Sequence, residues 1–259
     1  MSFLKVDGPA RVVAHRGVSA LCPENTRRAF QLAVECGADA IECDLQLTSD
    51  DRIVICHDYS FERYGHPGTV VHESPYSQLK LLDMGSWFGS EFHDQRLLLL
   101  EDLLNEFGGR IPLLLEVKAE HLTSDRIETM LDCLLSQLRP KHLPRPVAVL
   151  CFDISVLERI HRLNPDVPLV LNTLSPDRID GSFLKTHSYL AGVDGWIDQL
   201  NCDFGKIVHQ SGMSAMTFTC DDDHLVRKAV ESRVDFIITN DPVTTRSRLQ
   251  HQANNPHAA

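Results

Sequence analysis

The chain of 259 residues carries 36 acidic and 25 basic side chains, so its formal net charge at pH 7 is -11. That charge argues against nucleic acid or an anionic membrane as a docking surface, because both are polyanions. With 43% hydrophobic residues the chain can bury a large core, and we expect a single domain over residues 1–245 followed by a frayed polar tail over 246–259.

The eight cysteines include no Cys-x-x-Cys pair. Several lie inside apolar runs, so we interpret them as small buried hydrophobic residues in a reducing compartment rather than as zinc ligands or a disulfide framework. The first residues lack an apolar signal-peptide core, and no run reaches eighteen apolar residues. We therefore expect a cytoplasmic protein without stable membrane association.

A short apolar strand over 11–14 is followed by a helical pattern over 24–36 that Gly37 closes,. The next two apolar runs, 40–45 and 53–56, are joined by too few residues for a helical crossover and should form an antiparallel hairpin. Because strand side chains alternate, Glu42 and Asp44 share one face. With a turn centred near Asp50 and Asp51, His57 would return roughly opposite Asp44.

No clean period holds from about 59 to 96, and we interpret this insertion as a small excursion folded over one end of the domain. Beyond it we expect a helix over 97–107, with strands and helices alternating from 112 to 239, and the stretch 173–193 is the hardest to assign. Parallel strands near 12, 41, 114, 149, 170, 195, 216 and 237 number eight, which predicts a (β/α)8 TIM barrel.

Three carboxylates stand in apolar strands: Glu42, Asp44 and Glu116. Burying unpaired ions costs several kcal/mol, so they need compensating charge. That charge is either one divalent cation, Mg²⁺ or Ca²⁺ for a set of oxygen ligands, or salt bridges to Arg16 and Lys118. Both basic residues suit phosphate oxygens, Arg through its fork and Lys as a point charge.

Two histidines, His15 and His57, end strands on either side of these carboxylates. An imidazole titrates near neutrality, so the pair could serve as an acid and a base.

At these residues the sequence resembles the glycerophosphodiester phosphodiesterase family. The matching pieces are His15-Arg16-Gly17, Pro23-Glu24-Asn25-Thr26, Glu42-x-Asp44, His57-Asp58 and Glu116-x-Lys118, and the likeness continues through 83–88 and 237–242. The resemblance implies that His15 and His57 act as general acid and base, without saying which does which. Phe218 stands where many relatives carry Trp, so it either lines the glycerol site or is plain core.

The resemblance implies metal-dependent hydrolysis of a small-molecule glycerophosphodiester to an alcohol and sn-glycerol 3-phosphate. Two alternatives stay open: a lysophospholipase D-like or other phosphodiesterase of the same superfamily, and a barrel that uses metal and histidine for lyase or isomerase chemistry or only binds a ligand. The excursion also departs from the family over 62–66, which leaves the preferred alcohol open.

Overall fold

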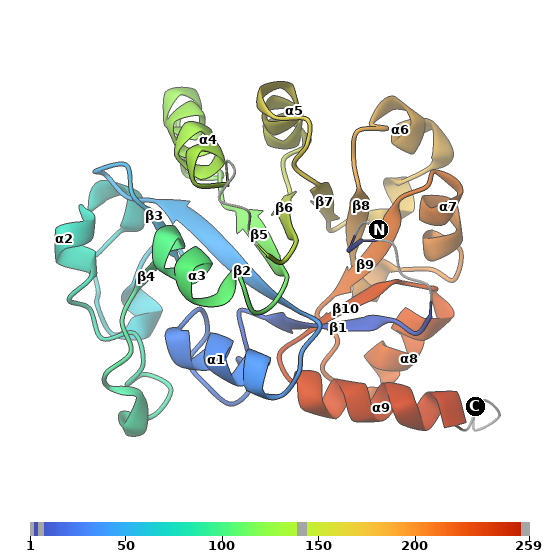
Figure 1. Ribbon diagram of the computed structural model, residues 1–259, viewed down its shortest axis with the longest axis horizontal. Helices are drawn as coiled ribbons and strands as arrows, with labels where there is room; N and C mark the ends of the chain where they lie inside the picture. Colours follow the sequence, from blue (N-terminus) through green and yellow to red (C-terminus); the bar gives the residue numbers. More distant parts are fainter. Residues whose placement is uncertain (1–2, 5–7, 139–143, 255–259) are drawn as a thin grey trace.

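The computed structural model describes residues 3–4, 8–138 and 144–254, and within these ranges eight parallel strands close into a barrel with helices around it (Figure 1). Closure follows from the pairing of β1 with both β2 and β10. The predicted TIM barrel is confirmed. In chain order its strands are β1 Arg11–His15, β2 Ala40–Leu47, β5 Leu113–Val117, β6 Val147–Cys151, β7 Leu169–Thr173, β8 Gly192–Trp196, β9 Ser214–Phe218 and β10 Phe236–Thr239.

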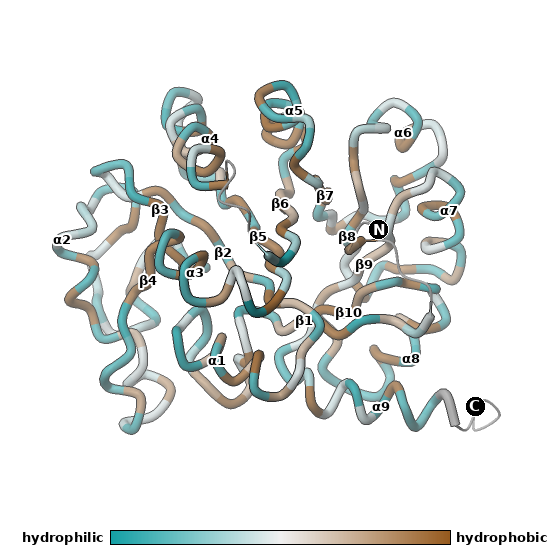
Figure 2. Tube along the Cα trace, viewed as in Figure 1, coloured by the Kyte–Doolittle hydropathy of each residue, from teal (hydrophilic) through white to brown (hydrophobic). Residues whose placement is uncertain are grey.

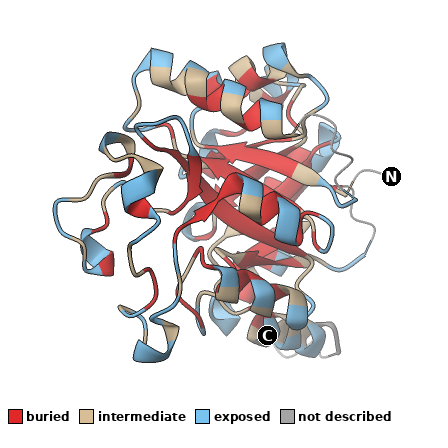
Figure 3. Cartoon of the chain, turned by 60° about the vertical axis from the view of Figure 1, so that its left-hand side comes forward, coloured by how far each residue is buried: buried red, intermediate tan, exposed pale blue. Residues whose placement is uncertain are grey.

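Most helices that follow the barrel strands are amphipathic and turn their apolar side to the sheet, whereas the last helix, α9, is mostly polar. In α5, for example, Val156, Leu157 and Ile160 are buried against the barrel, as spacings of three and four residues require. Figure 2 shows apolar and polar residues alternating along these helices, and Figure 3 shows the strands almost wholly buried. The helices are α1 Arg27–Glu35, α3 Leu100–Phe107, α4 Ser124–Leu138, α5 Ile154–Leu163, α6 Gly181–Thr186, α7 Phe204–Gln210, α8 Asp223–Glu231 and α9 Pro242–Asn254.

The barrel interior is apolar at the end where its strands begin. Side chains such as Val13, Leu114 and Phe236 fill it, and Leu4 joins the same buried cluster. The ring of Phe3 packs on Phe236 with centroids 5.2 Å apart. Because these contacts close the amino-terminal end, polar side chains can gather only at the opposite end.

Strand β2 is long enough to serve two sheets. Its first half pairs inside the barrel, and its second half pairs with the antiparallel strand β3 Ile53–Ile55, which in turn pairs with β4 Leu98–Leu99. The excursion leaves from this hairpin and contains the short helix α2 Tyr76–Leu79 together with 3-10 turns at Glu62–Tyr64, Val71–Glu73 and Ser90–Phe92. It has its own buried cluster, built around residues such as Phe61, Val71 and Leu79.

Several elements differ from the sequence expectations. Residues 246–254 are not a frayed tail but continue helix α9, where Arg246 donates to the Gly37 carbonyl and pairs with Asp39; residues 255–259 lie outside the described ranges. The helix expected over 97–107 begins at Leu100, after the short strand β4. The uncertain stretch 173–193 holds α6.

The eight cysteines are free thiols, and five of them are buried. Within the described residues, none of the helices combines the length and the apolar character that a bilayer crossing requires.

Candidate active site

The residues singled out from the sequence meet at the carboxyl ends of the barrel strands. His15 is the last residue of β1 and pairs in register with Glu42 of β2, while Asp44 pairs in register with Glu116 of β5. Lys118 follows β5 directly. Enzymes of this fold keep their catalytic groups at this end of the barrel.

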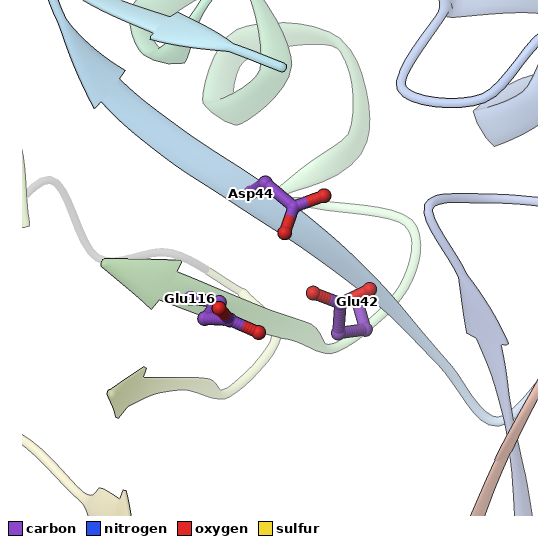
Figure 4. Close-up of side chains that lie close together, drawn as sticks. All are labelled: Glu42, Asp44 and Glu116. Carbon is purple, nitrogen blue, oxygen red and sulfur yellow. The ribbon is translucent and has the colours of Figure 1, made fainter. Parts of the chain in front are cut away.

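Three carboxylates converge there, as Figure 4 shows for Glu42, Asp44 and Glu116. One ligand atom from each lies within 4.8 Å of the others, and all three side chains are buried. Glu42 Oε1 has no hydrogen-bond partner in the described part of the chain. Buried oxygens that face one another in this way form a set that could hold a hard cation.

The three carboxylates differ in their affinity for protons. Burial, with the charge of Asp44 next to it, raises the pKa of Glu42 well above its ordinary value and that of Glu116 to about 7. Burial opposes ionisation of Asp44 as well, but Arg16 and Lys118 outweigh it and hold its pKa below the ordinary value. Asp44 is therefore the carboxylate that stays charged.

Arg16 reaches this cluster because the chain turns sharply after β1. Arg16 and Gly17 both have left-handed backbones, with φ of 55° and 81°, which costs a non-glycine residue about 1–2 kcal/mol. A Cβ on Gly17 would lie 2.6 Å from the Ala29 backbone, so the position excludes other residues. The turn lets the Arg16 amide donate to Glu42 Oε2 at 3.1 Å, while Arg16 Nε lies 3.2 Å from Asp44 Oδ2.

Lys118 lies on the other side of the cluster. Its Nζ is 3.1 Å from Asp44 Oδ1 and also contacts Glu116 Oε1. The salt bridges weighed as an alternative to a metal site therefore exist. Two cations, Arg16 and Lys118, face three buried carboxylates, so with all three ionised one negative charge would remain unbalanced. Glu24 also takes up part of Arg16, with a contact of 3.0 Å.

The segment Pro23-Glu24-Asn25-Thr26 leads from the turn after β1 into helix α1. Thr26 caps helix α1 by accepting from the Ala29 amide. Asn25, with φ of 57°, donates from Nδ2 to Asp44 Oδ2 at 2.8 Å. This short segment therefore fixes the start of a helix and orients one of the three carboxylates.

The tautomer of His15 follows from its neighbours. Asn240 donates from Nδ2 to Asp221 Oδ2 at 2.6 Å, which leaves its Oδ1 to accept from His15 Nδ1 at 2.7 Å. His15 Nε2 is then the unprotonated nitrogen, and it lies 3.9 Å from Glu42 Oε2. Burial, reinforced by the charge of Arg16, lowers the pKa of His15 to about 4, so the ring is neutral at pH 7.

His57 is oriented by its neighbour in the sequence, since its Nδ1 lies 2.7 Å from Asp58 Oδ1. Its position differs by one residue from the expectation. Strand β2 pairs with β3 as Leu45 with Ile55, and the Cys56 amide donates to the Asp44 carbonyl at 3.0 Å, so Cys56 rather than His57 lies opposite Asp44. This one-residue difference arises in the loop between β2 and β3, in which Asp51 takes a left-handed backbone with φ of 61°,.

Both histidines, Arg16 and Lys118 line a cavity of about 330 Å³, which we call the phosphate pocket. Phe218 lines it too and packs edge-on against Phe152, with ring centroids 5.9 Å apart. Phe218 is half-buried, so its ring forms part of the pocket wall as well as packing against the core.

Two polar residues of the barrel interior were not foreseen. Asn172 on β7 is buried and donates to Glu116 Oε2 at 3.1 Å. Asp194, its in-register neighbour on β8, is buried as well, and burial together with the charge of Glu116 raises its pKa. Their signal in the sequence is a polar residue directly after a short apolar run, since Asn172 follows Leu169-Val170-Leu171 and Asp194 follows Val193.

The arrangement places the chain among the TIM-barrel enzymes, with a pocket that two basic side chains line beside a cluster of carboxylates. The glycerophosphoryl diester phosphodiesterase family is matched over residues 15–244, so the chain belongs to this family.

Individual relatives agree with that assignment. The chain is 31% identical over 233 residues to the Bacillus subtilis protein YhdW, covering 89% of this chain and 94% of the relative. It is 26% identical over 244 residues to a Bacillus subtilis glycerophosphodiester phosphodiesterase, and the match covers 89% of this chain and 83% of that relative. The Oleispira antarctica phosphodiesterase, solved in complex with the product sn-glycerol-3-phosphate, shares the fold with a TM-score of 0.83 at 24% identity, over 93% and 97% of the two chains.

Proposed function

We propose that the chain hydrolyses small glycerophosphodiesters to an alcohol and sn-glycerol 3-phosphate, using one divalent cation bound by Glu42, Asp44 and Glu116. The observation that supports this most is the convergence of three buried carboxylates beside Arg16 and Lys118. A carboxylate set of this kind matches a cation, and the two basic side chains match a phosphate. The names of the relatives point to the same substrate class.

The residues present fit a hard divalent cation, Mg²⁺ or Ca²⁺. All three donors are carboxylates, and in the ionised form that a cation requires they carry one more negative charge than Arg16 and Lys118 balance,. Glu42 Oε1 is buried without a hydrogen-bond partner in the described residues. A bound cation would supply Lewis-acid stabilisation of charge on the phosphate. Arg16 and Lys118 would hold the non-bridging oxygens, since each already lies within salt-bridge distance of this cluster.

We assign the roles of the histidines from their hydrogen bonds. His15 is neutral at pH 7 with Nε2 unprotonated, so it would accept the proton of the glycerol 2-hydroxyl as that oxygen attacks phosphorus,. His57, held through Nδ1 by Asp58, would donate a proton from Nε2 to the departing alkoxide. The resulting cyclic phosphate would then be opened by water with the two roles reversed. Direct attack by water would use the same residues.

The structure favours a deacylated substrate over a lysophospholipid. Apolar side chains of the excursion could have formed a wall for an acyl chain, but Leu79, Tyr76, Leu82 and Trp87 belong to the excursion's own core. Leu81, with 72% of its surface exposed, and Phe88 lie outside it. None of these residues lines the phosphate pocket.

The test is release of glycerol 3-phosphate from glycerophosphocholine, followed by a coupled dehydrogenase. Chelation and dialysis should abolish release, and Mg²⁺ or Ca²⁺ should restore it, with thiol reagents having less effect. Full activity after exhaustive chelation would remove the metal assignment. Absence of glycerol 3-phosphate with every cation and diester tried would remove the proposed reaction.

A further inference from the structure

A second cavity, of about 610 Å³, opens directly beside the phosphate pocket. We call it the excursion pocket, because its walls are the first part of the excursion on one side and the loop after β5 on the other. His57 and Lys118 line both cavities. The shared residues mark the boundary at which a bound phosphorus atom would lie.

Displacement at phosphorus places the entering and leaving oxygens roughly in line on opposite sides. With phosphorus at the boundary, one half of a diester would then lie in each cavity. The phosphate pocket contains His15, the residue assigned to the glycerol hydroxyl, whereas the excursion pocket contains His57 but not His15. We propose that the excursion pocket binds the alcohol half of the substrate and selects alcohols that carry a positive charge, such as choline or ethanolamine. This inference rests on the proposed function and deepens it.

The first argument is the aromatic wall of the excursion pocket. Tyr59 and His121 are in ring contact on this wall, with centroids 4.2 Å apart, and His72 stacks parallel to His121 at 6.3 Å. The three rings come from separate segments of the chain. Tyr59 keeps 49% of its surface exposed, so the part of its ring that His121 leaves uncovered is open to a ligand. A tyrosine face attracts ammonium and quaternary ammonium groups.

The second argument is charge. Asp58 and Arg63 lie 2.7 Å apart and neutralise each other, and Lys118 is held by Asp44 and Glu116 deeper in the barrel. Two further carboxylates, Glu62 and Glu120, line the pocket without an ion pair anywhere in the described ranges. Both are exposed, and they add two carboxylates to the mouth that pair with no basic side chain of the described residues.

The two features act on the same ligand. A cationic alcohol meets an aromatic face and two carboxylates, whereas a neutral polyol gains neither attraction and an anionic alcohol is repelled.

The experiment compares kcat/KM for glycerophosphocholine and glycerophosphoglycerol, two diesters that differ in the charge of the alcohol. We expect the wild-type enzyme to prefer glycerophosphocholine by about tenfold, from aromatic and electrostatic terms at an exposed site. The double variant Glu62→Gln, Glu120→Gln and the single variant Tyr59→Ala should each lower that ratio to about threefold or less. Choline should also inhibit the wild-type enzyme more strongly than either variant.

Glu91→Gln is the matched control, because Glu91 is an exposed carboxylate of the same excursion that lines neither cavity. The ratio of kcat/KM for glycerophosphocholine to that for glycerophosphoglycerol should be the same in this variant as in the wild type. A wild-type ratio near one, or a ratio that the pocket variants leave unchanged, would overturn the inference while the proposed hydrolysis stands. If the wild-type enzyme cleaves neither diester with any cation, the proposed function fails and the inference falls with it.

Discussion

Cation binding should weaken as the pH falls, because the carboxylates proposed to hold the cation also bind protons. Burial raises the pKa of Glu116 to about 7, against an ordinary value of 4.5, and raises that of Glu42 as well. A divalent cation requires the ionised form of its ligands, so it must displace these protons to bind.

The size of the effect follows from the pKa of Glu116. A carboxyl group with a pKa of about 7 is roughly 90% protonated at pH 6 and roughly 10% protonated at pH 8. The affinity for the cation should therefore be about tenfold lower at pH 6 than at pH 8, equivalent to about 1.4 kcal/mol of binding free energy. A second proton on Glu42 would steepen the dependence further.

Titration calorimetry with Mg²⁺ at pH 6, 7 and 8, in two buffers of different ionisation enthalpy, measures both the affinity and the protons released. Glu116→Gln should lower the affinity at pH 8 and flatten its pH dependence. Glu231→Gln, which changes an exposed carboxylate on α8, should do neither. An affinity for the wild-type protein that is equal at pH 6 and pH 8, with no proton released, would refute the reasoning.

The raised pKa of Glu116 should also make the stability of the folded protein depend on pH. Since Glu116 binds its proton more tightly in the folded chain than in the unfolded one, the cation-free protein should lose stability as the pH rises from about 4.5 to about 7,. Added cation should therefore raise the melting temperature more at pH 8 than at pH 6. Thermal unfolding with and without Mg²⁺ measures the difference, and an equal gain at both pH values would contradict it.

Three further predictions concern the reacting groups and the substrate. His15→Ala and His57→Ala should each lose roughly 10² to 10⁴ in kcat while remaining folded; near wild-type turnover in either would make that histidine structural. Asn240→Leu removes the acceptor that fixes the His15 tautomer, so kcat should fall by about tenfold or more with little change in KM, and an unchanged kcat would separate Asn240 from the chemistry,. Glycerophosphocholine should be preferred to the matching lysophospholipid below its micellar concentration; a tenfold preference in the other direction would overturn the choice of substrate, though not the metal site.

The barrel could be predicted because its strands are short apolar runs separated by helices with clear periodicity. The proposed site could be located for the same reason, since the carboxyl ends of parallel strands meet at one end of the barrel. His15, Glu42, Asp44 and Glu116 therefore followed from their places in the strands. What the sequence left open was the function of each residue, which the family resemblance suggested.

Features that depend on exact geometry could not be predicted in this way. The position of His57 depends on the hairpin loop, in which the Thr48 amide donates to the Arg52 carbonyl and Asp51 has a left-handed backbone. The strand Ile53–Ile55 is apolar and buried on both faces, so its hydrophobic pattern could not distinguish this register from one shifted by one residue. Residues 246–254 of helix α9 were expected to be a tail because their sequence is mostly polar. The helix is held against the barrel by contacts such as that of Arg246 with Asp39. Asn172 donates to Glu116, which lies 56 positions earlier in the chain, and no local pattern in the sequence indicates such a contact.

The excursion has a core of its own, so most of its residues can change with little effect on the barrel. Phe61, Val71 and Leu79 pack among themselves and against the hairpin rather than in the barrel core. Arg63 and Tyr64 are exceptions, because both contact Glu24, which holds Arg16 beside the carboxylates. Insertions or exchanges within residues 59–96 that keep these two side chains can therefore reshape the excursion pocket without moving the carboxylates on β2 and β5. A chimera that receives this segment from a relative should acquire the donor's choice of alcohol while keeping its own cation and histidines.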